Sequence, residues 1–431
     1  MTFVTRITMQ NITLSCPNRN ISGEITLDGS KSISNRVLLI RALSNQYFKI
    51  DNLSHSDDTI TMERLLNSHE TLYDAGHAGT TFRFLTAYLA VKEGTQILTG
   101  SERMKQRPIS HLVTALNDLG ANISYVEKEG YPPIKIGPPA TGLKDEITLS
   151  ADVSSQFVSA LLMIAPTLPN GLTLHLDGEI VSEPYIRMTL SIMEYFGIAS
   201  TWEDKTFKIP NQSYQVKDFT VEADWSAASY YYAIAALSDT ADLTLKGLQK
   251  GSIQGDVEIV EIAKKYGIET HCGDNMITIV KASGTPNLSN LEQNFTDIPD
   301  LTQTVSVICA GLGTIALFSG LHTLRIKETD RIAALQSELL KLQVFLNKMP
   351  EKFSKKSGIE YFMQEGIATC VADEIPVIET FDDHRMAMAF APLALIFPIV
   401  IKHPEVVSKS YPDFWKDLRS LGFIMSLDSS Q

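Results

Sequence analysis

The stretch Ala115-Leu-Asn-Asp-Leu-Gly120-Ala-Asn-Ile123 decides the fold class, because it joins the end of an amphipathic helix to the start of a β-strand through one glycine. The same pattern recurs in Ile192-Met-Glu-Tyr-Phe-Gly197-Ile198 and in Ile262-Ala-Lys-Lys-Tyr-Gly267-Ile268. Each glycine fits the left-handed conformation just past a helix end, which glycine adopts without steric cost. A spacing of roughly 75 residues is too long for a solenoid repeat, so the pattern predicts a repeated α/β subdomain.

Short segments rich in β-branched residues lie between the predicted helices, at residues 147–149, 172–176, 219–222 and 243–246. These strands are short, the helices are long, and they do not follow the strict alternation of a doubly wound sheet. We therefore expect sheets that cover buried helices. The N-termini of such helices would point into one central cleft.

Length and charge narrow the class of protein. The 431 residues exceed what one core usually supports, so we expect two domains. A hydrophobic fraction of 44% and a charged fraction of 20% are typical of a soluble globular protein. The net charge of -13 argues against a nucleic-acid partner and against binding to anionic membranes.

The cysteines and the chain start indicate a cytoplasmic protein. Residues 1–10 contain no basic segment followed by an apolar core, so no signal peptide is expected. The longest apolar run, residues 386–401, contains two prolines and is too short to cross a bilayer, so we expect it in the core. The cysteines match neither a disulfide framework nor a zinc spacing, and we expect reduced, mostly buried thiols at Cys16, Cys272, Cys309 and Cys370.

The segment Thr323-Leu-Arg-Ile-Lys-Glu-Thr-Asp-Arg331 places both charge signs at the predicted start of a helix that continues over residues 332–341. Lys327 and Arg331, on one face by their i,i+4 spacing, would lie where the helix dipole disfavours cations. Most such segments are solvated charge runs. Four helix starts of this kind, however, indicate a shared anionic ligand with phosphate or carboxylate groups. The other three lie at residues 31–36, 78–83 and 382–385.

The usual cofactor motifs are incomplete. Asp28-Gly-Ser-Lys-Ser32 lacks the glycine that precedes lysine in a phosphate-binding loop, and Gly311-Leu-Gly313 lacks the third glycine of a dinucleotide fingerprint. The histidines have no metal-ligand spacing. We therefore expect no ATP, no NAD, no metal and no other cofactor. Asp300, which follows Pro299 at a predicted helix start, is either a helix cap or a catalytic base.

Nine motifs in chain order resemble those of the 5-enolpyruvylshikimate-3-phosphate synthase family, and together they span nearly the whole chain. One such motif is weak, but nine in this order are highly specific. They are Lys31-Ser-x-Ser-x-Arg36, Ala78-Gly-Thr80 with Arg83, Arg107-Pro-Ile109, Ser154-Ser-Gln156, Ser182-x-Pro-Tyr185, Ile298-Pro-Asp300, Arg325-x-Lys-Glu-Thr-Asp-Arg331, Asp383-His-Arg-Met-Ala387 and Lys409-x-Tyr-Pro-Asp413.

The resemblance implies an inverted α/β barrel in two domains, each built of repeated subdomains with helices buried under sheets. One domain would be discontinuous, formed by residues 1–29 and 223–431. Residues 30–222 would form the inserted second domain, with the active site in the cleft between the two. Family members usually have two further strands where residues 65–73 stand, so one subdomain is expected to be truncated.

The resemblance also implies transfer of the enolpyruvyl group of phosphoenolpyruvate to the 5-hydroxyl of shikimate 3-phosphate, with release of phosphate, in the shikimate pathway. The implied base is Asp300, the acid at carbon is Glu328, and Lys31 stabilises the leaving phosphate. Shikimate 3-phosphate would bind to Lys31, Ser32, Arg36, Ser154, Ser155, Gln156, Ser182, Tyr185, Asp300, Thr323 and Lys327. Phosphoenolpyruvate would bind to Lys31, Gly79, Arg107, Gln156, Arg331, Arg385 and Lys409. The enzyme is expected to be a cytoplasmic monomer.

Three residues depart from the family pattern: His77, Phe84 and Thr323 stand where the family usually has Asn, Pro and Asn. His77 and Phe84 flank the loop expected to bind phosphoenolpyruvate. Gly79 in this loop resembles the glyphosate-sensitive form of the family, so we expect inhibition by glyphosate.

Two other functions compete with this reading. The related enolpyruvyl transferase that acts on UDP-N-acetylglucosamine usually carries a reactive cysteine on the loop matching residues 100–107, and this loop has none. A non-catalytic anion-binding homologue would not need the four residues expected to perform the chemistry. All four are retained: Lys31, Asp300, Glu328 and Arg385.

Overall fold

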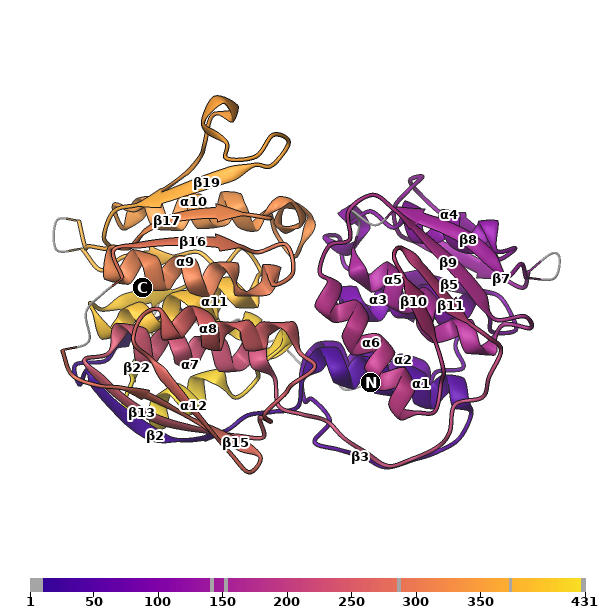
Figure 1. Cartoon of the computed structure of the whole chain (residues 1–431), viewed down its shortest axis with the longest axis horizontal. Helices are drawn as coiled ribbons and strands as arrows, with labels where there is room; N and C mark the ends of the chain where they lie inside the picture. The colour runs from indigo at the N-terminus through magenta and orange to yellow at the C-terminus, as the bar shows by residue number, and fades with distance from the viewer. Residues whose placement is uncertain (1–10, 140–142, 151–153, 285–287, 372–373, 428–431) are drawn as a thin grey trace. The chain divides into compact units, whose positions relative to one another are not determined.

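The computed structural model describes residues 11–139, 143–150, 154–284, 288–371 and 374–427, so the expectation about residues 1–10 lies outside the described residues. The chain divides into two compact units (Figure 1). Unit 1 is formed by Met1–Leu27, Asp224–Ser252 and Asp256–Gln431, and unit 2 by Asp28–Ala223 and Ile253–Gly255.

Unit 2 contains two four-stranded sheets, one two-stranded sheet and six α-helices within the described residues. Its elements, with η for 3-10 helices, are α1 (Lys31–Ser44), β3 (Ile50–Asp51), α2 (Asp57–Leu66), β4 (Leu72–Asp74), α3 (Gly79–Ala90), β5 (Gln96–Thr99), η1 (Met104–Gln106), α4 (Ser110–Asp118), β6 (Asn122–Tyr125), β7 (Ile134–Gly137), β8 (Glu146–Ser150), α5 (Ser155–Ile164), η2 (Ala165–Thr167), β9 (Leu172–Asp177), α6 (Glu183–Tyr195), β10 (Thr201–Glu203), β11 (Thr206–Ile209) and β12 (Phe219–Thr220).

Unit 1 contains three four-stranded sheets and six α-helices within the described residues. Its elements are β1 (Ile12–Ser15), β2 (Asn20–Thr26), α7 (Trp225–Leu237), β13 (Thr240–Lys246), η3 (Gly255–Glu258), α8 (Ile259–Lys264), β14 (Glu269–Gly273), β15 (Met276–Lys281), β16 (Asn290–Asn294), η4 (Pro299–Leu301), α9 (Thr302–Leu312), β17 (Ile315–Ser319), η5 (His322–Ile326), α10 (Arg331–Lys341), β18 (Phe345–Lys348), η6 (Glu351–Phe353), β19 (Tyr361–Glu365), β20 (Val377–Ile378), α11 (His384–Phe390), η7 (Ala391–Leu395), β21 (Ile399–Ile401), η8 (Pro404–Lys409), α12 (Phe414–Ser420) and β22 (Ile424–Leu427).

The five four-stranded sheets share one pairing pattern. An edge strand pairs in parallel with its neighbour, and the next two pairings are antiparallel; in one sheet β16 runs parallel to β17, and β17–β19 and β19–β18 are antiparallel. Figure 1 shows β16, β17 and β19 side by side. Along the chain this subdomain reads strand, helix, strand, helix and hairpin. The prediction of a repeated α/β subdomain is therefore confirmed.

The sixth sheet is the truncated one that we expected. Among the described residues it contains only the parallel pair β3–β12. In four of the other subdomains the second helix is followed by an antiparallel hairpin, and in the fifth α12 is followed by β22, which pairs with β1 from the start of the described chain. By contrast, α2 is followed by residues 67–71 and then by β4, which belongs to another sheet. The subdomain of α1 and α2 thus keeps its parallel strands and lacks its hairpin.

The three glycines that define the repeat close their helices as predicted. Gly120, Gly197 and Gly267 have φ values of 106°, 79° and 70°. The N–H of the residue after each glycine donates to the carbonyl five residues earlier, as Ala121 does to Leu116. This is the hydrogen bond of a Schellman helix end, which requires a left-handed residue at the glycine.

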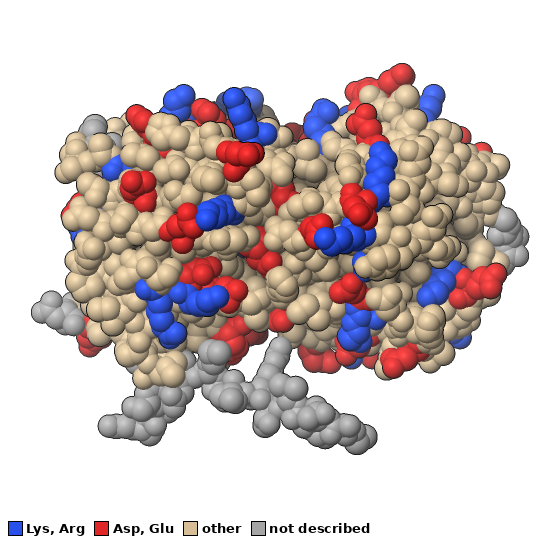
Figure 2. Space-filling model, turned by 90° about the horizontal axis from the view of Figure 1, so that it is seen from below, with Lys and Arg blue, Asp and Glu red and all other residues tan. Residues whose placement is uncertain are grey.

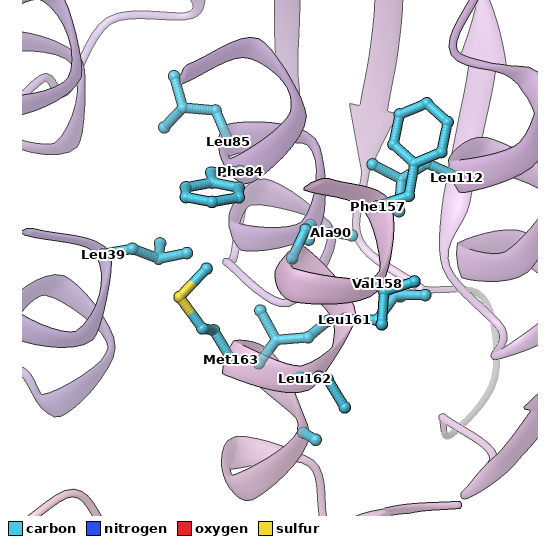
Figure 3. Packing of buried hydrophobic residues seen from close by; sticks show 14 of the residues in the cluster. Leu39, Phe84, Leu85, Ala90, Leu112, Phe157, Val158, Leu161, Leu162 and Met163 are labelled. Atoms are coloured by element: carbon cyan, nitrogen blue, oxygen red, sulfur yellow. The ribbon is translucent and has the colours of Figure 1, made fainter. Parts of the chain in front are cut away.

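The helices α5 and α7 are buried along almost their whole length. In α5 only Gln156, and in α7 only Ser226, is not buried. Side chains of α1, α3 and α5 meet in the core of unit 2, where Figure 3 shows Leu39, Phe84 and Met163 close together. Long apolar helices thus bury their whole length and leave a polar residue of the first turn accessible.

Two expectations about composition can be checked. The described cysteines are free, but only Cys16 and Cys309 are buried, and Cys272 is exposed because it lies on the edge strand β14. No helix in the described part of the chain is long and apolar enough to cross a membrane. On the face shown in Figure 2, acidic and basic side chains are interspersed.

Candidate functional site

Asp300 in unit 1 is held between two guanidinium groups. It lies in η4, directly after Pro299. Arg331 Nη1 donates to Asp300 Oδ1 at 2.9 Å, and Arg385 Nη2 donates to Oδ2 at 2.8 Å. Lys327 Nζ lies 4.0 Å from Oδ1. Because Arg331 is fully buried, these charge-assisted bonds are poorly screened by water.

A second carboxylate, Glu328, bridges Arg331 and Lys409. Arg331 Nη2 donates to Glu328 Oε2 at 2.9 Å, and Lys409 Nζ donates to Oε1 at 3.0 Å. Arg331 Nε also donates to Asp383 Oδ2 at 2.7 Å. Four cations thus meet the three carboxylates bonded to them, and unit 1 brings six predicted site residues together: Asp300, Lys327, Glu328, Arg331, Arg385 and Lys409.

The prediction that Lys327 and Arg331 share one helix face is wrong. Lys327 follows η5 with extended backbone angles (φ -81°, ψ -152°), and α10 begins only at Arg331. The reason is Asp330, whose carboxylate accepts the N–H groups of Ile332 and Ala333, both at 3.1 Å, and so fixes the start of the helix one residue before Arg331.

The helix dipole therefore explains only some of the cation-rich helix starts. Asp330 and Asp383 cap α10 and α11, and an acidic cap complements the dipole. By contrast, the N-cap residues of α1 and α3 are Ser30 and Ala78, which carry no charge, and no acidic residue lies in the first turn of either helix. The expectation that all four helices break the dipole rule is wrong for α10 and α11, where the cations are gathered by carboxylates.

The charges in this cluster shift one another's pKa values. Burial alone would raise the pKa of Asp300, but Arg385, Lys327 and Arg331 hold it well below its usual range. Burial alone would lower the pKa of Arg331, whereas Asp383, Glu328 and Asp300 raise it above its usual value. Asp300 is thus an ionised and very weak base in this arrangement.

Asp256, which sequence reasoning missed, adjoins the cluster. It accepts a hydrogen bond from Ser226 Oγ, which lies 3.4 Å from Arg385 Nη2. Asp256 Oδ1 is buried and has no hydrogen-bond partner among the described residues. Burial, and then the charge of Asp300, raises the pKa of Asp256 to about 7. No local signal marks this residue, because its hydrogen-bond partner Ser226 lies 30 residues away in the sequence, in α7.

In unit 2, Arg36 is buried among neutral oxygens. Its guanidinium donates to Thr189 Oγ1 at 2.7 Å, Ser159 Oγ at 3.1 Å, Tyr185 O at 3.3 Å and Ser32 O at 2.9 Å. Burial lowers the pKa of Arg36 to about 10. A buried cation hydrogen-bonded to neutral groups would gain from an anion nearby.

Lys31 begins α1, and its Nζ lies 3.5 Å from Oδ2 of the buried Asp58. Sequence reasoning also missed Asp58, although it stands in the first turn of a helix. Lys31 is thus oriented by a carboxylate from α2, which packs against α1.

A second group of predicted residues lies at the start of α3. A Cβ atom at Gly79 would lie 2.6 Å from Arg107 Nη1 and 2.8 Å from Arg83 Nη1. Gln156 Nε2 donates to Thr80 Oγ1 at 2.9 Å, which joins α5 to the same helix start. Two guanidinium groups, one glycine and one amide therefore meet at one end of α3.

The remaining predicted residues lie at helix ends. Ser154 caps α5 through a 3.3 Å bond from Gln156 N, which is the capping role that such a serine often has. Ser155 is the first residue of α5, Tyr185 lies in the first turn of α6, and Ser182 precedes α6 in a left-handed conformation with φ 55°. Thr323 lies in η5 and is half-buried.

Within the described residues, no group of three or more His, Cys, Asp or Glu side chains could hold a metal ion. The chemistry on offer is that of carboxylates and cations: binding of phosphate and carboxylate groups, and proton transfer by Asp300, Glu328 or Asp256.

The fold has solved counterparts. The structure of an EPSP synthase from Acinetobacter baumannii matches with a TM-score of 0.73 at 19% sequence identity, and the match covers 97% of this chain and 100% of that chain. The chain is thus an α/β protein of repeated subdomains with the enolpyruvyl transferase fold.

Sequence comparison gives the family. The EPSP synthase (3-phosphoshikimate 1-carboxyvinyltransferase) family matches residues 16–68 and 63–418. A 3-phosphoshikimate 1-carboxyvinyltransferase of Bacteroides fragilis is 49% identical over 413 residues, covering 95% of this chain and 97% of that protein. Another, from Vibrio atlanticus, is 37% identical over 445 residues, covering 96% and 100%. The chain belongs to the EPSP synthase family.

The Vibrio alignment, at 445 positions, is longer than the 431 residues of this chain. It therefore includes positions that this chain lacks, in keeping with the hairpin missing after α2.

Proposed function

We propose that this chain transfers the enolpyruvyl group of phosphoenolpyruvate to the 5-hydroxyl of shikimate 3-phosphate and releases phosphate. Membership of the EPSP synthase family supports this reaction. The observation that carries the assignment is the carboxylate of Asp300 held between Arg331 and Arg385, because it combines an anion-binding group with a proton acceptor.

Shikimate 3-phosphate is assigned to residues of α1, α5 and α6, together with Asp300, Thr323 and Lys327. The buried guanidinium of Arg36 supports a phosphate subsite there, since its partners are neutral oxygens. The residues assigned from unit 2 are Lys31, Ser32, Arg36, Ser154, Ser155, Gln156, Ser182 and Tyr185.

Phosphoenolpyruvate is assigned to the Arg107 guanidinium beside Gly79 and to the cations around Glu328 and Asp300. A small dianionic phosphate with a carboxylate requires several cations at short range. The assigned residues are Lys31, Gly79, Arg107, Gln156, Arg331, Arg385 and Lys409.

In the addition step, the 5-hydroxyl oxygen forms a bond to C2 of phosphoenolpyruvate. Asp300 takes the hydroxyl proton, and Glu328 gives a proton to C3, which becomes a methyl group. In the elimination step, Glu328 takes a proton back from C3 and the bond between C2 and the phosphate oxygen breaks. Lys31 stabilises the charge on the departing phosphate.

The pKa of Asp300 gives this scheme a physical requirement. Its cationic neighbours hold the pKa low, so Asp300 is a poor base without ligand. Substrate phosphate and carboxylate groups would compete for the N–H groups of Arg385 and Arg331 and would screen their charge. The pKa of Asp300 would then rise toward its usual range, so the base gains strength when the substrates are bound.

Phosphate release tests the proposal directly. The protein should release inorganic phosphate when phosphoenolpyruvate and shikimate 3-phosphate are both present, and not with either alone. Asp300→Asn serves as the matched variant, and it should slow release roughly 100- to 10,000-fold, the usual contribution of a general base. No release with both substrates, or equal release from phosphoenolpyruvate alone, would contradict the transferase assignment.

We further propose that the enzyme acts as a cytoplasmic monomer. Four described thiols without a disulfide fit a reducing compartment. Sedimentation of the purified protein would test the monomer, which predicts a mass near 47.7 kDa.

A further inference from the structure

Three polar side chains from different elements form a hydrogen-bonded chain near Lys409. Tyr231 comes from α7, Tyr411 follows η8, and Asp417 lies in α12. The phenol oxygens of Tyr231 and Tyr411 are 2.6 Å apart, and Tyr411 donates to Asp417 Oδ2 at 2.6 Å. Both tyrosines are buried.

The direction of these two hydrogen bonds follows from the number of protons that the two phenols carry. Burial raises the pKa of Tyr231 and of Tyr411 far above the usual value, so both phenols are neutral near pH 7 and each carries one proton. Tyr411 gives its proton to Asp417, so Tyr231 must donate to Tyr411. The series of hydrogen bonds thus ends at the Asp417 carboxylate, so the bond from Tyr411 to Asp417 is charge-assisted.

The hydrogen bonds of Tyr411 also fix the backbone segment that carries Lys409. Tyr411 N donates to Val407 O at 2.7 Å, so the backbone turns tightly across Lys409. On the other side of the segment, Trp415 Nε1 of α12 donates to Pro404 O at 2.8 Å. Both ends of Pro404–Lys409 are therefore tied to α12, and Tyr411 ties the second end to α7 as well.

Helix α7 also reaches the other side of the cation cluster. Tyr230, next to Tyr231, has its phenol oxygen 3.4 Å from Arg385 Nη1. Its ring and that of Tyr411 both pack edge-on against Phe414, at 5.8 Å and 5.6 Å between ring centres. Two successive tyrosines of one helix thus contact Arg385 directly and Lys409 through Tyr411.

We propose that Tyr411 is a positioning residue that holds the Lys409 ammonium against Glu328. Lys409 Nζ lies 3.0 Å from Glu328 Oε1 with only 11% of the Lys409 side chain exposed. A lysine has four rotatable bonds, so its ammonium reaches one place only if its backbone is fixed and its surroundings are closed. Tyr231, Tyr411 and Asp417 supply that fixed backbone.

The inference rests on the proposed function for its kinetic test. Tyr411→Phe should raise the KM for phosphoenolpyruvate about 5- to 20-fold, because a small displacement of a binding group costs this much, and should leave the KM for shikimate 3-phosphate within about twofold. In a Lys409→Ala background the same change should add less than about twofold, because Tyr411 acts through Lys409.

A matched control comes from the same helix. Tyr232 of α7 is also buried, and its phenol oxygen lies 2.9 Å from Thr270 Oγ1, away from η8. Tyr232→Phe removes a similar hydrogen bond and should change neither KM. Equal KM values for Tyr411→Phe and the parent, or effects of Tyr411→Phe and Lys409→Ala that multiply, would overturn the positioning role.

A second measurement does not depend on activity. The rate at which an N-hydroxysuccinimide acetate reagent acylates Lys409 can be followed by peptide mass spectrometry. Tyr411→Phe should raise this rate several-fold as the ammonium loosens from Glu328, and Tyr232→Phe should not. An unchanged rate in Tyr411→Phe would overturn the positioning role even if the parent proved inactive, whereas failure of the proposed function would show as absent phosphate release in the parent.

Discussion

The guanidinium carbon of Arg36 lies 5.4 Å from the centre of the Phe84 ring. This cation–π contact joins α1 to α3, the helix that begins at Gly79. Phe84 therefore links the residue assigned to shikimate 3-phosphate with the helix start assigned to phosphoenolpyruvate. A substitution at Arg36 or Phe84 should therefore affect both of these binding regions of unit 2.

Removing the charge of Arg36 should weaken shikimate 3-phosphate binding by roughly 2 to 5 kcal/mol, because a desolvated phosphate loses its cation. Arg36→Met is the suitable change, since an unbranched apolar side chain can still fill the space against Phe84. Titration calorimetry measures the affinity. Arg187→Met is the control, because Arg187 also lies over an aromatic ring but is exposed on α6. Unchanged affinity in Arg36→Met would remove Arg36 from the site.

Gly79→Ala should raise the inhibition constant of glyphosate more than the KM for phosphoenolpyruvate. The added Cβ would lie 2.6 Å from Arg107 Nη1 and 2.8 Å from Arg83 Nη1, so both guanidinium ends must shift. The two guanidinium ends are flexible, so phosphoenolpyruvate should still bind with a moderate rise in KM. Glyphosate is longer and needs the space that the added methyl group occupies, so its binding should weaken more. Steady-state inhibition measured against phosphoenolpyruvate gives both constants, and an unchanged ratio would exclude Gly79 from this subsite.

The sequence predicts the repeated architecture well because its signals are local. A glycine at each helix end forces a left-handed residue, and Gly120, Gly197 and Gly267 close their helices in the same way. The truncated subdomain was also predictable, since a hairpin needs residues and the segment after α2 is too short to hold one. Such features depend on a few neighbouring residues and not on distant contacts.

The arrangement of the charged cluster was predictable only in part. The motifs identify Arg331, Asp300 and Arg385 as site residues. They do not show that the Asp300 carboxylate lies between the two guanidinium groups. Lys327 was placed wrongly, because the cap formed by Asp330 starts the helix later than charge spacing suggested. Asp256 was missed, because its unpartnered oxygen results from packing between segments far apart in the sequence.

Glu328→Gln should retain substrate binding and slow turnover. The amide keeps nearly the same shape between Arg331 and Lys409 but cannot exchange a proton with C3 of phosphoenolpyruvate. Deuterium incorporation from solvent into the methylene group, measured by mass spectrometry, isolates this proton transfer. Glu360→Gln, which changes an exposed carboxylate of the same unit, is the control. Exchange at the parent rate in Glu328→Gln would mean that another residue is the acid.

Asp256→Asn should change how the stability of the protein depends on pH. The folded-state pKa of Asp256 is raised to about 7 from the usual aspartate value of 3.8, so between about pH 4 and pH 7 the folded protein holds a proton that the unfolded chain has released. In that window the free energy of unfolding contributed by Asp256 falls as pH rises, by at most about 4 kcal/mol at roughly 1.4 kcal/mol per pKa unit. In Asp256→Asn the free energy of unfolding should not fall in this way, because the asparagine does not ionise.

Denaturant unfolding of parent and variant at several pH values tests this expectation. Relative to the parent, Asp256→Asn should become steadily more stable from about pH 4 to pH 7, and the difference should level off above pH 7. Asp300 does not titrate in this window, because its lowered pKa confines its effect on stability, which has the opposite sign, to strongly acidic conditions. Asp242→Asn, on the exposed side of β13, is the control for losing a carboxylate. A constant difference between Asp256→Asn and the parent would mean that Asp256 ionises equally in the folded and unfolded chain, and that its buried oxygen is compensated by water or by a rearranged partner.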